Sequence, residues 1–92
     1  MTTSEKIKKL KEALKDLENK EEISEKAGDA YELDLENPEK EKAFDDTYKV
    51  EFAAFMSVSA SLAKLIGIDE KTARAMIGGK RAEVWNILNR AI

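Results

Sequence analysis

Ser57, Ser59 and Ser61 carry hydroxyls at alternate positions, and a serine hydroxyl becomes a nucleophile when a neighbouring base activates it. The base is usually histidine, which is also a common zinc ligand, and the chain has no histidine. It has no cysteine either, which excludes disulfides and thiolate metal sites. The sequence therefore predicts a protein without catalytic residues and without a cofactor.

A set of carboxylates precedes the single proline. Oxygen ligands of this type can bind calcium or magnesium, but the segment lacks the glycine and the twelfth-position glutamate of a calcium-binding loop. We therefore expect a solvated acidic face and no metal site. The carboxylates are Asp29, Glu32, Asp34 and Glu36.

The segment Gly78–Arg81 places two glycines before two cations. Free backbone amides at a helix N-terminus can hold an anion. A phosphate-binding P-loop, however, needs a glycine five positions before Gly79, where Arg74 stands, and a hydroxyl residue after Lys80, where Arg81 stands. The favoured interpretation is a plain turn between two helices.

Residues 62–77 have the spacing of two helices joined by a tight turn. A small residue lies four positions before a turn glycine, an apolar residue follows the turn, and apolar positions recur after it. These places are held by Ala63, Gly67, Ile68, Ala73 and Met76. The segment resembles the helix-turn-helix of DNA-binding repressors.

That resemblance implies that the second helix of the unit reads a DNA groove. The nucleic-acid-binding residues would be Lys71 and Arg74, with Lys80 and Arg81 adding phosphate contacts. Two consecutive carboxylates at the start of that helix, and a net charge of −3 for the chain, oppose DNA binding. A structural helix corner is the alternative that we favour.

Charge is distributed unevenly along the chain. Residues 1–48 carry 9 basic and 15 acidic side chains, and residues 49–92 carry 7 basic and 4 acidic ones, so affinity for a polyanion would lie in the second half. The first residues lack the apolar core of a secretory signal, and no apolar stretch reaches the length of a membrane span. We expect a cytoplasmic protein that does not bind a membrane.

The apolar spacing predicts one all-α domain over residues 1–92, a small four-helix bundle-like domain built on an antiparallel pair of long helices plus two short C-terminal helices. Pro38–Ile66 contains no glycine and no second proline, and Asn37 before it is a favourable N-cap. A break near Asp45–Thr47 is left open, and Gly28 is expected to stop the first helix. The expected elements are a helix over 2–27, an extended connector over 29–37, a long helix over 38–66, and helices over 70–77 and 80–91.

Two apolar stripes follow the long helices. The first has the spacing of a coiled-coil seam, but two heptads are too few for an autonomous coiled coil, so it packs on the chain's own second helix or on a second copy. The only tryptophan, Trp85, is the type of residue enriched at binding hot spots, although it could instead plug the end of the bundle. The partner-binding residues expected from the sequence are Leu10, Leu14 and Leu17 of the seam, and Trp85, Leu88 and Ile92.

A wider pattern covers residues 33–92. It comprises an acidic Asp-Leu segment from Leu33 to Glu39, a long helix with Phe52 and Phe55, then Gly67-Ile-Asp, and finally Ile77-Gly-Gly-Lys80 before a last helix. This pattern is similar to small tail-assembly chaperones of phages and prophages in Gram-positive bacteria. The resemblance implies a non-enzymatic protein that binds and shields another protein's helices during virion assembly.

The leading hypothesis from the sequence is a non-enzymatic helical protein–protein interaction module, such as a phage or prophage assembly chaperone, that binds a protein partner or forms a homodimer. The alternative hypothesis is a helix-turn-helix DNA-binding regulator that uses residues 62–77.

Overall fold

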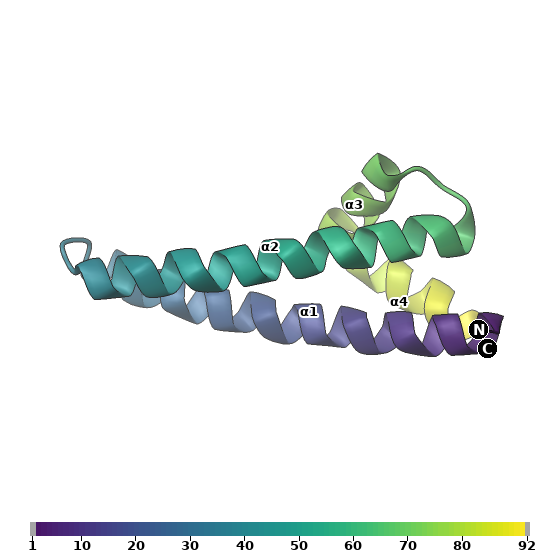
Figure 1. Cartoon of the computed structure of the whole chain (residues 1–92), viewed down its shortest axis with the longest axis horizontal. Helices are drawn as coiled ribbons and strands as arrows, with labels where there is room; N and C mark the ends of the chain where they lie inside the picture. The colour runs from purple at the N-terminus through teal and green to yellow at the C-terminus, as the bar shows by residue number, and fades with distance from the viewer. Residues whose placement is uncertain (1, 92) are drawn as a thin grey trace.

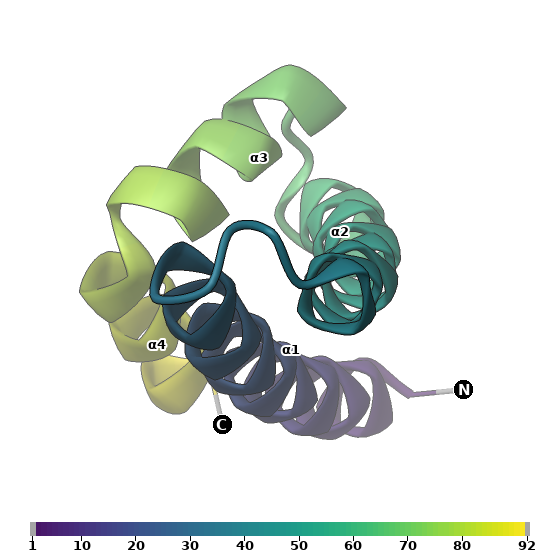
Figure 2. The same cartoon turned by 90° about the vertical axis from the view of Figure 1, so that its left-hand side faces the viewer.

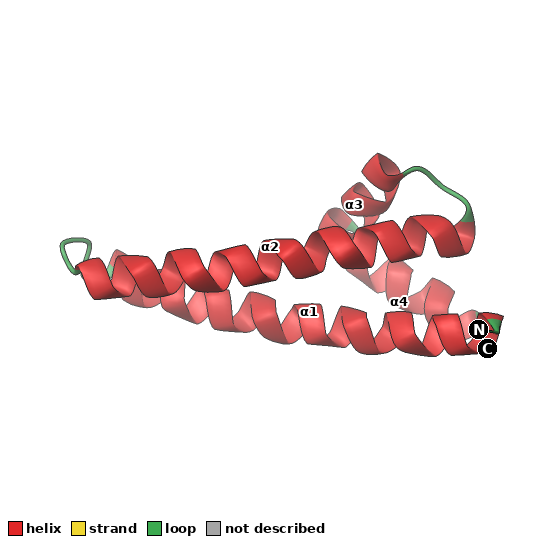
Figure 3. Cartoon of the chain, in the orientation of Figure 1, coloured by secondary structure: helices red, strands yellow, loops and turns green. Residues whose placement is uncertain are grey.

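The computed structural model describes residues 2–91, and this range forms four α-helices and no strand (Figure 3). Two long helices, α1 and α2, run antiparallel as a hairpin, and two short helices, α3 and α4, follow at one end (Figure 1). The molecule measures 49 × 21 × 21 Å. The predicted all-α class is confirmed. The helices are α1 (Thr3–Glu32), α2 (Pro38–Ile66), α3 (Glu70–Gly79) and α4 (Arg81–Arg90).

Side-chain caps explain where three of the helices begin. The oxygens of Thr2, Asn37 and Asp69 each accept a hydrogen bond from a backbone amide in the first turn of α1, α2 and α3, respectively. Such caps provide hydrogen-bond acceptors for the first backbone N–H groups of a helix, which have no carbonyl partner within the helix. At the other end of α2, Gly67 has φ 71°, in the left-handed region that favours glycine.

The first helix does not stop at Gly28, so the predicted limits of 2–27 for this helix and 29–37 for the connector are wrong. α1 continues to Glu32, and the connector shortens to residues 33–37. Gly28 faces Phe44 across the hairpin, and a Cβ atom at this position would lie 3.0 Å from Cε1 of the ring. The missing side chain therefore permits a close helix contact and does not mark the end of a helix.

α2 runs without a break through Asp45–Thr47. The Thr47 hydroxyl donates to the carbonyl oxygens of Ala43 and Phe44, at 2.9 and 3.0 Å, so it is satisfied within the helix. The last two helices are shifted slightly from their predicted limits of 70–77 and 80–91. α3 includes both glycines at its C-terminal end and α4 begins immediately after Lys80.

The hydrophobic core occupies only one half of the hairpin. We call this half the head (residues 2–17 and 57–91) and the rest the stem (residues 18–56). Within the stem, only Ser24 is buried, because α3 and α4 lie against the other half (Figure 1). The core residues are Ile7, Leu10, Leu14 and Leu17 of α1, Val58, Leu62 and Ala63 of α2, Ala73 and Ile77 of α3, and Val84 and Leu88 of α4.

The short helices cover one face of the hairpin. Seen from the loop end, α3 and α4 lie together on one side of the α1–α2 pair (Figure 2). α3 packs against α2, and α4 packs against α1. Among the described residues, no individual helix is both long enough and apolar enough to cross a membrane.

We expect Leu17→Ala to lower the free energy of unfolding by about 2–5 kcal/mol, because Leu17 is fully buried and its truncation leaves a cavity. The matched change Leu33→Ala, at a side chain that is 89% exposed, should alter it by less than about 0.5 kcal/mol. Urea denaturation followed by circular dichroism measures both values. Equal losses in the two variants would contradict a core confined to the head.

Candidate functional site

The seam of α1 is core and is not a partner surface. Leu10, Leu14 and Leu17 are 4%, 0% and 0% exposed, and Leu88 of α4 is 0% exposed. These four side chains have no surface to offer a partner, so their assignment as partner-binding residues is corrected. The seam packs within the chain's own bundle, which was the first of the two interpretations given from the sequence. Ile92 lies outside the described residues.

Trp85 lies half-buried at the edge of the core, where α4 meets α1. Its indole Nε1 donates a hydrogen bond to Oε2 of Glu18 at 2.9 Å. The polar end of the ring therefore has an intramolecular partner, and the ring packs against the core. This arrangement is typical of a residue that closes the end of the core, and less typical of an exposed binding hot spot.

Arg81 is held by the same part of α1. Its guanidinium makes two parallel hydrogen bonds to Glu21, at 2.6 and 2.8 Å, and a longer one to Glu18, at 3.4 Å. Its Nε donates to the carbonyl oxygen of Ile77 at 2.8 Å. The hydrogen bonds to Glu21 raise the pKa of Arg81. Because four of its five N–H donors bond to groups within the fold, Arg81 is engaged with α1 rather than presented to a phosphate, and this prediction is corrected.

Glu51 of α2 adds a third carboxylate near these residues. Burial, and secondly the charge of Glu21, raise the pKa of Glu51 above its usual value of 4.5. Glu18, Glu21 and Glu51, together with Arg81 and Trp85, mark the place where the head ends and the stem begins. Ion pairs at this position close the core with polar groups rather than with further apolar packing.

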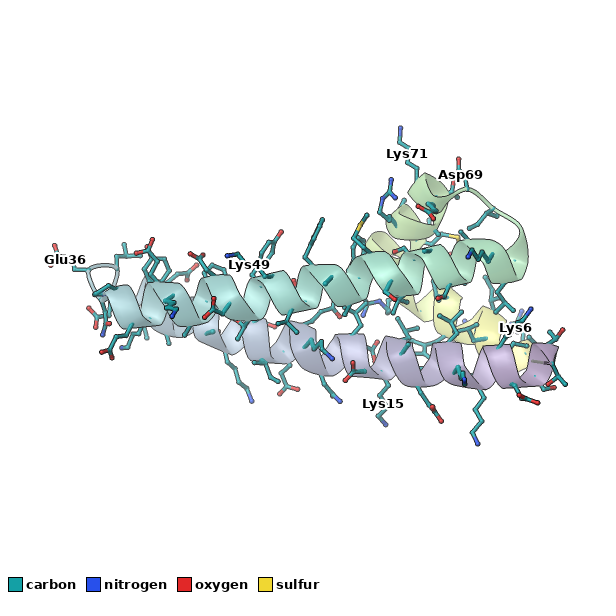
Figure 4. All side chains as sticks on the ribbon, viewed as in Figure 1. Lys6, Lys15, Glu36, Lys49, Asp69 and Lys71 are labelled. Atoms are coloured by element: carbon teal, nitrogen blue, oxygen red, sulfur yellow. The ribbon has the colours of Figure 1, made fainter. Side chains whose placement is uncertain are left out.

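The remaining cations of the predicted DNA-reading unit are on the surface. Lys71 extends away from α3 (Figure 4), Lys80 is exposed, and Arg74 lies 3.9 Å from Glu70 of its own helix. α2 and α3 form an angle of 116° across the turn at residues 67–69, which is within the range of helix-turn-helix units. The Asp69 carboxylate accepts hydrogen bonds from Thr72, which lower its pKa and keep a negative charge beside this surface.

The acidic residues before Pro38 lie on the surface in the last turn of α1 and in the loop, with Glu36 at the tip of the hairpin (Figure 4). Asp34 accepts a hydrogen bond from Asn37 at 3.2 Å and lies 3.6 Å from the Lys40 ammonium. Among residues 2–91, no group of three or more acidic side chains has an arrangement that could hold a metal ion.

The most distinctive feature of the stem is a row of aromatic rings, which we call the aromatic row. Consecutive rings have centroid separations of 6.2, 6.3, 6.3 and 6.5 Å. This spacing is typical of interacting aromatic pairs. The aromatic row comprises Tyr31 of α1 and Phe44, Tyr48, Phe52 and Phe55 of α2.

Much of the aromatic row is open to solvent. Tyr48 and Phe52 are 51% and 50% exposed, and the neighbouring Met56 is 37% exposed. The apolar spacing of α2 indicated a stripe of the kind that usually forms a core. The spacing alone did not reveal that the stem part of this stripe is left uncovered by the other helices. The sequence therefore contained the signal for this surface, and its exposure became evident only from the packing of α3 and α4.

The opposite face of the stem also exposes apolar side chains. Ile23 and Val50 are 56% and 52% exposed and line a shallow groove of about 370 Å³. This face lacks aromatic residues, and its groove is bordered by a mixture of cations and carboxylates. Val50 lies two residues from Phe52 on α2 and therefore points to the other side of the helix. It provides a matched reference position for the aromatic row.

Charge distinguishes the stem from the head. The stem carries 13 carboxylates and 5 lysines, whereas the rest of the chain carries 6 carboxylates and 11 cations. The aromatic row thus lies on a strongly acidic rod. Such a surface attracts cationic partners and repels nucleic acids and other acidic surfaces.

Comparison of the chain with protein-family models, with curated proteins and with solved structures finds no match. The functional argument therefore depends on the residues of this chain.

We expect Glu51→Gln to raise the melting temperature at pH 7. The raised pKa means that the ionised Glu51 side chain is less favourable in the folded chain than in the unfolded chain. The folded state therefore loses stability as the pH rises through the raised pKa, and the uncharged glutamine avoids this loss. Since the group is partly solvated, the gain should be small, about 1–3 °C. The gain should vanish as the pH falls below the usual value of 4.5.

Thermal denaturation of both proteins between pH 3 and pH 8 measures this difference. Glu25→Gln, at an exposed carboxylate on the same stem, is the control for the general removal of negative charge. An equal gain from Glu25→Gln would contradict a specific effect of burial at Glu51.

Proposed function

We propose that this chain is a non-enzymatic, cytoplasmic protein–protein interaction module and that the aromatic row is its binding surface. The observation that carries the proposal is the half-exposed state of Tyr48 and Phe52 on a helix face that is core elsewhere in α2. Contiguous exposed apolar surface bordered by polar residues is typical of interaction sites in proteins.

The energetics favour a partner on this surface. An aromatic side chain buries about 150–250 Å² when it is fully covered. Covering the exposed half of Tyr48 or Phe52 would therefore remove about 100 Å² from water, which is worth about 2–3 kcal/mol for each ring. The rings already contact one another along α2, so little side-chain entropy is lost when a partner covers them.

A role as an assembly chaperone of a phage or prophage is the specific form of this proposal. Its support is the sequence pattern over residues 33–92 that resembles small tail-assembly chaperones. In that role the aromatic row would shield apolar segments of another protein until they assemble. The fold suits the task, because the exposed aromatic row can accept a helix without unfolding of the stem.

The proposal predicts different cross-linking from two neighbouring positions of α2. Replacing Phe52 by the photo-reactive p-benzoylphenylalanine should yield one recurrent cross-linked protein in the native host, identified by mass spectrometry. The same replacement at Val50, which is equally exposed on the opposite face, should yield several-fold less. Equal yields of the same proteins from both positions would count against the aromatic row.

A helix-turn-helix regulator is the second candidate function. The observation that favours it is the 116° angle between α2 and α3, together with the outward position of Lys71 and the excess of cations outside the stem (Figure 4). Phosphate contacts from this region would make DNA binding sensitive to salt. Arg81 takes no part in this candidate, because it is bound to Glu21.

If this second candidate holds, a mixed-sequence DNA duplex should bind at low salt in a fluorescence anisotropy titration. Lys71→Ala combined with Arg74→Ala should then weaken binding and reduce the slope of log K against log salt by about 2. Lys15→Ala combined with Lys49→Ala is the control, because it removes two cations away from α3 (Figure 4). Absence of binding at low salt would eliminate the DNA candidate.

A further inference from the structure

The aromatic row continues, in the stem, the face of α2 that is covered in the head. Tyr48, Phe52 and Phe55 precede Ser59 and Leu62 in α2 at steps of four, three, four and three residues, so all five share one face of the helix. Ser59 and Leu62 are 1% and 0% exposed, whereas Tyr48 and Phe52 are half exposed. The face changes from covered to open where the short helices end.

A single additional helix fits the open section. The row from Phe44 to Phe55 is about 17 Å long at 1.5 Å per residue, which is close to the length of a ten-residue helix such as α3. A helix satisfies its own backbone hydrogen bonds, so it can lie on aromatic rings without leaving buried polar groups unpaired. The length of the aromatic row therefore suits a helix of about three turns.

Carboxylates border the aromatic row on both sides. On α1, Gly28 faces the Phe44 ring. Glu25 lies three residues before Gly28 and Glu32 lies four residues after it, so both are on the same face of α1. On α2, one acidic side chain lies a turn before Phe44 and another lies beside it, while the exposed Lys49 follows on the same edge four residues later. The four carboxylates are exposed. They are Glu25 and Glu32 of α1 and Glu41 and Asp45 of α2.

The same charges oppose the pairing of two stems. Each stem carries 13 carboxylates and only 5 lysines, so a second copy packed on the aromatic row would bring like charges together. A helix with lysine or arginine beside its apolar face would instead complement the carboxylates on both sides of the aromatic row.

We propose that the aromatic row binds a cationic amphipathic helix of another protein. The apolar face of that helix lies on Tyr48 and Phe52, and its lysine or arginine side chains pair with the carboxylates that border the aromatic row. This inference rests on the proposed function and adds the chemical class of the partner.

The test uses the full chain and three synthetic fluorescent peptides of 14 residues with the same leucine positions. Their polar positions are all lysine, all glutamine or all glutamate. Anisotropy titrations at 50 mM and 300 mM salt should show the lysine peptide binding at least about tenfold more tightly than the glutamine peptide at low salt. The glutamate peptide should show no binding.

Two matched variants show where the lysine peptide binds. Phe52→Ser should weaken its affinity about tenfold, whereas Val50→Ser should change it less than about twofold, because Val50 lies on the opposite face. Neither should unfold the protein, since the two side chains are about half exposed, and circular dichroism checks this. Changing Glu25, Glu32 and Glu41 to Gln together with Asp45 to Asn should reduce the salt dependence, because other carboxylates of the stem remain.

Three outcomes would overturn the inference. Equal affinity for the glutamine and lysine peptides, with loss in Phe52→Ser, would leave the aromatic row as a binding surface but refute a cationic partner. Equal affinity of Phe52→Ser and Val50→Ser would show general attraction to an acidic rod, and the proposed site would fail as well. A dimer in sedimentation equilibrium that Phe52→Ser dissociates would identify a second copy as the occupant.

Discussion

The fold depends on a mismatch of helix lengths. α1 and α2 have 30 and 29 residues and are each about 45 Å long, whereas α3 and α4 have ten residues each and are about 15 Å long. Because α3 also crosses α2 at 116°, the short helices reach only one end of the hairpin. A shared core can form only where the short helices reach. The head therefore contains the buried leucines of α1, and the stem is a two-helix hairpin with open faces.

The boundary between head and stem is stabilised by polar contacts. Glu18 and Glu21 of α1 hold Arg81 and Trp85 of α4, and Glu51 of α2 lies nearby with a raised pKa. Beyond these residues, α1 and α2 contact each other through small or aromatic side chains. Gly28 against the Phe44 ring is the clearest example, because any side chain at Gly28 would have to displace that ring.

The aromatic row connects this architecture to the proposed function. In the stem the rings stabilise the hairpin by contacting one another, but they remain only partly covered because α3 and α4 pack against the head. A chain of this length could have used polar residues at these exposed positions without loss of the core. The retention of apolar rings on an otherwise strongly acidic rod is most simply explained by a partner that covers them.

The helices themselves follow from local sequence, because caps and periodicity act within a few residues. Asn37 and Pro38 start α2, Gly67 ends it, and the steps of three and four define its apolar face. Local rules failed at Gly28, where a contact with a residue 16 positions away determines the role of the glycine. They also could not separate buried from exposed members of one stripe. Whether Leu17 or Phe52 is covered depends on where α3 and α4 lie, and only the tertiary structure decides that.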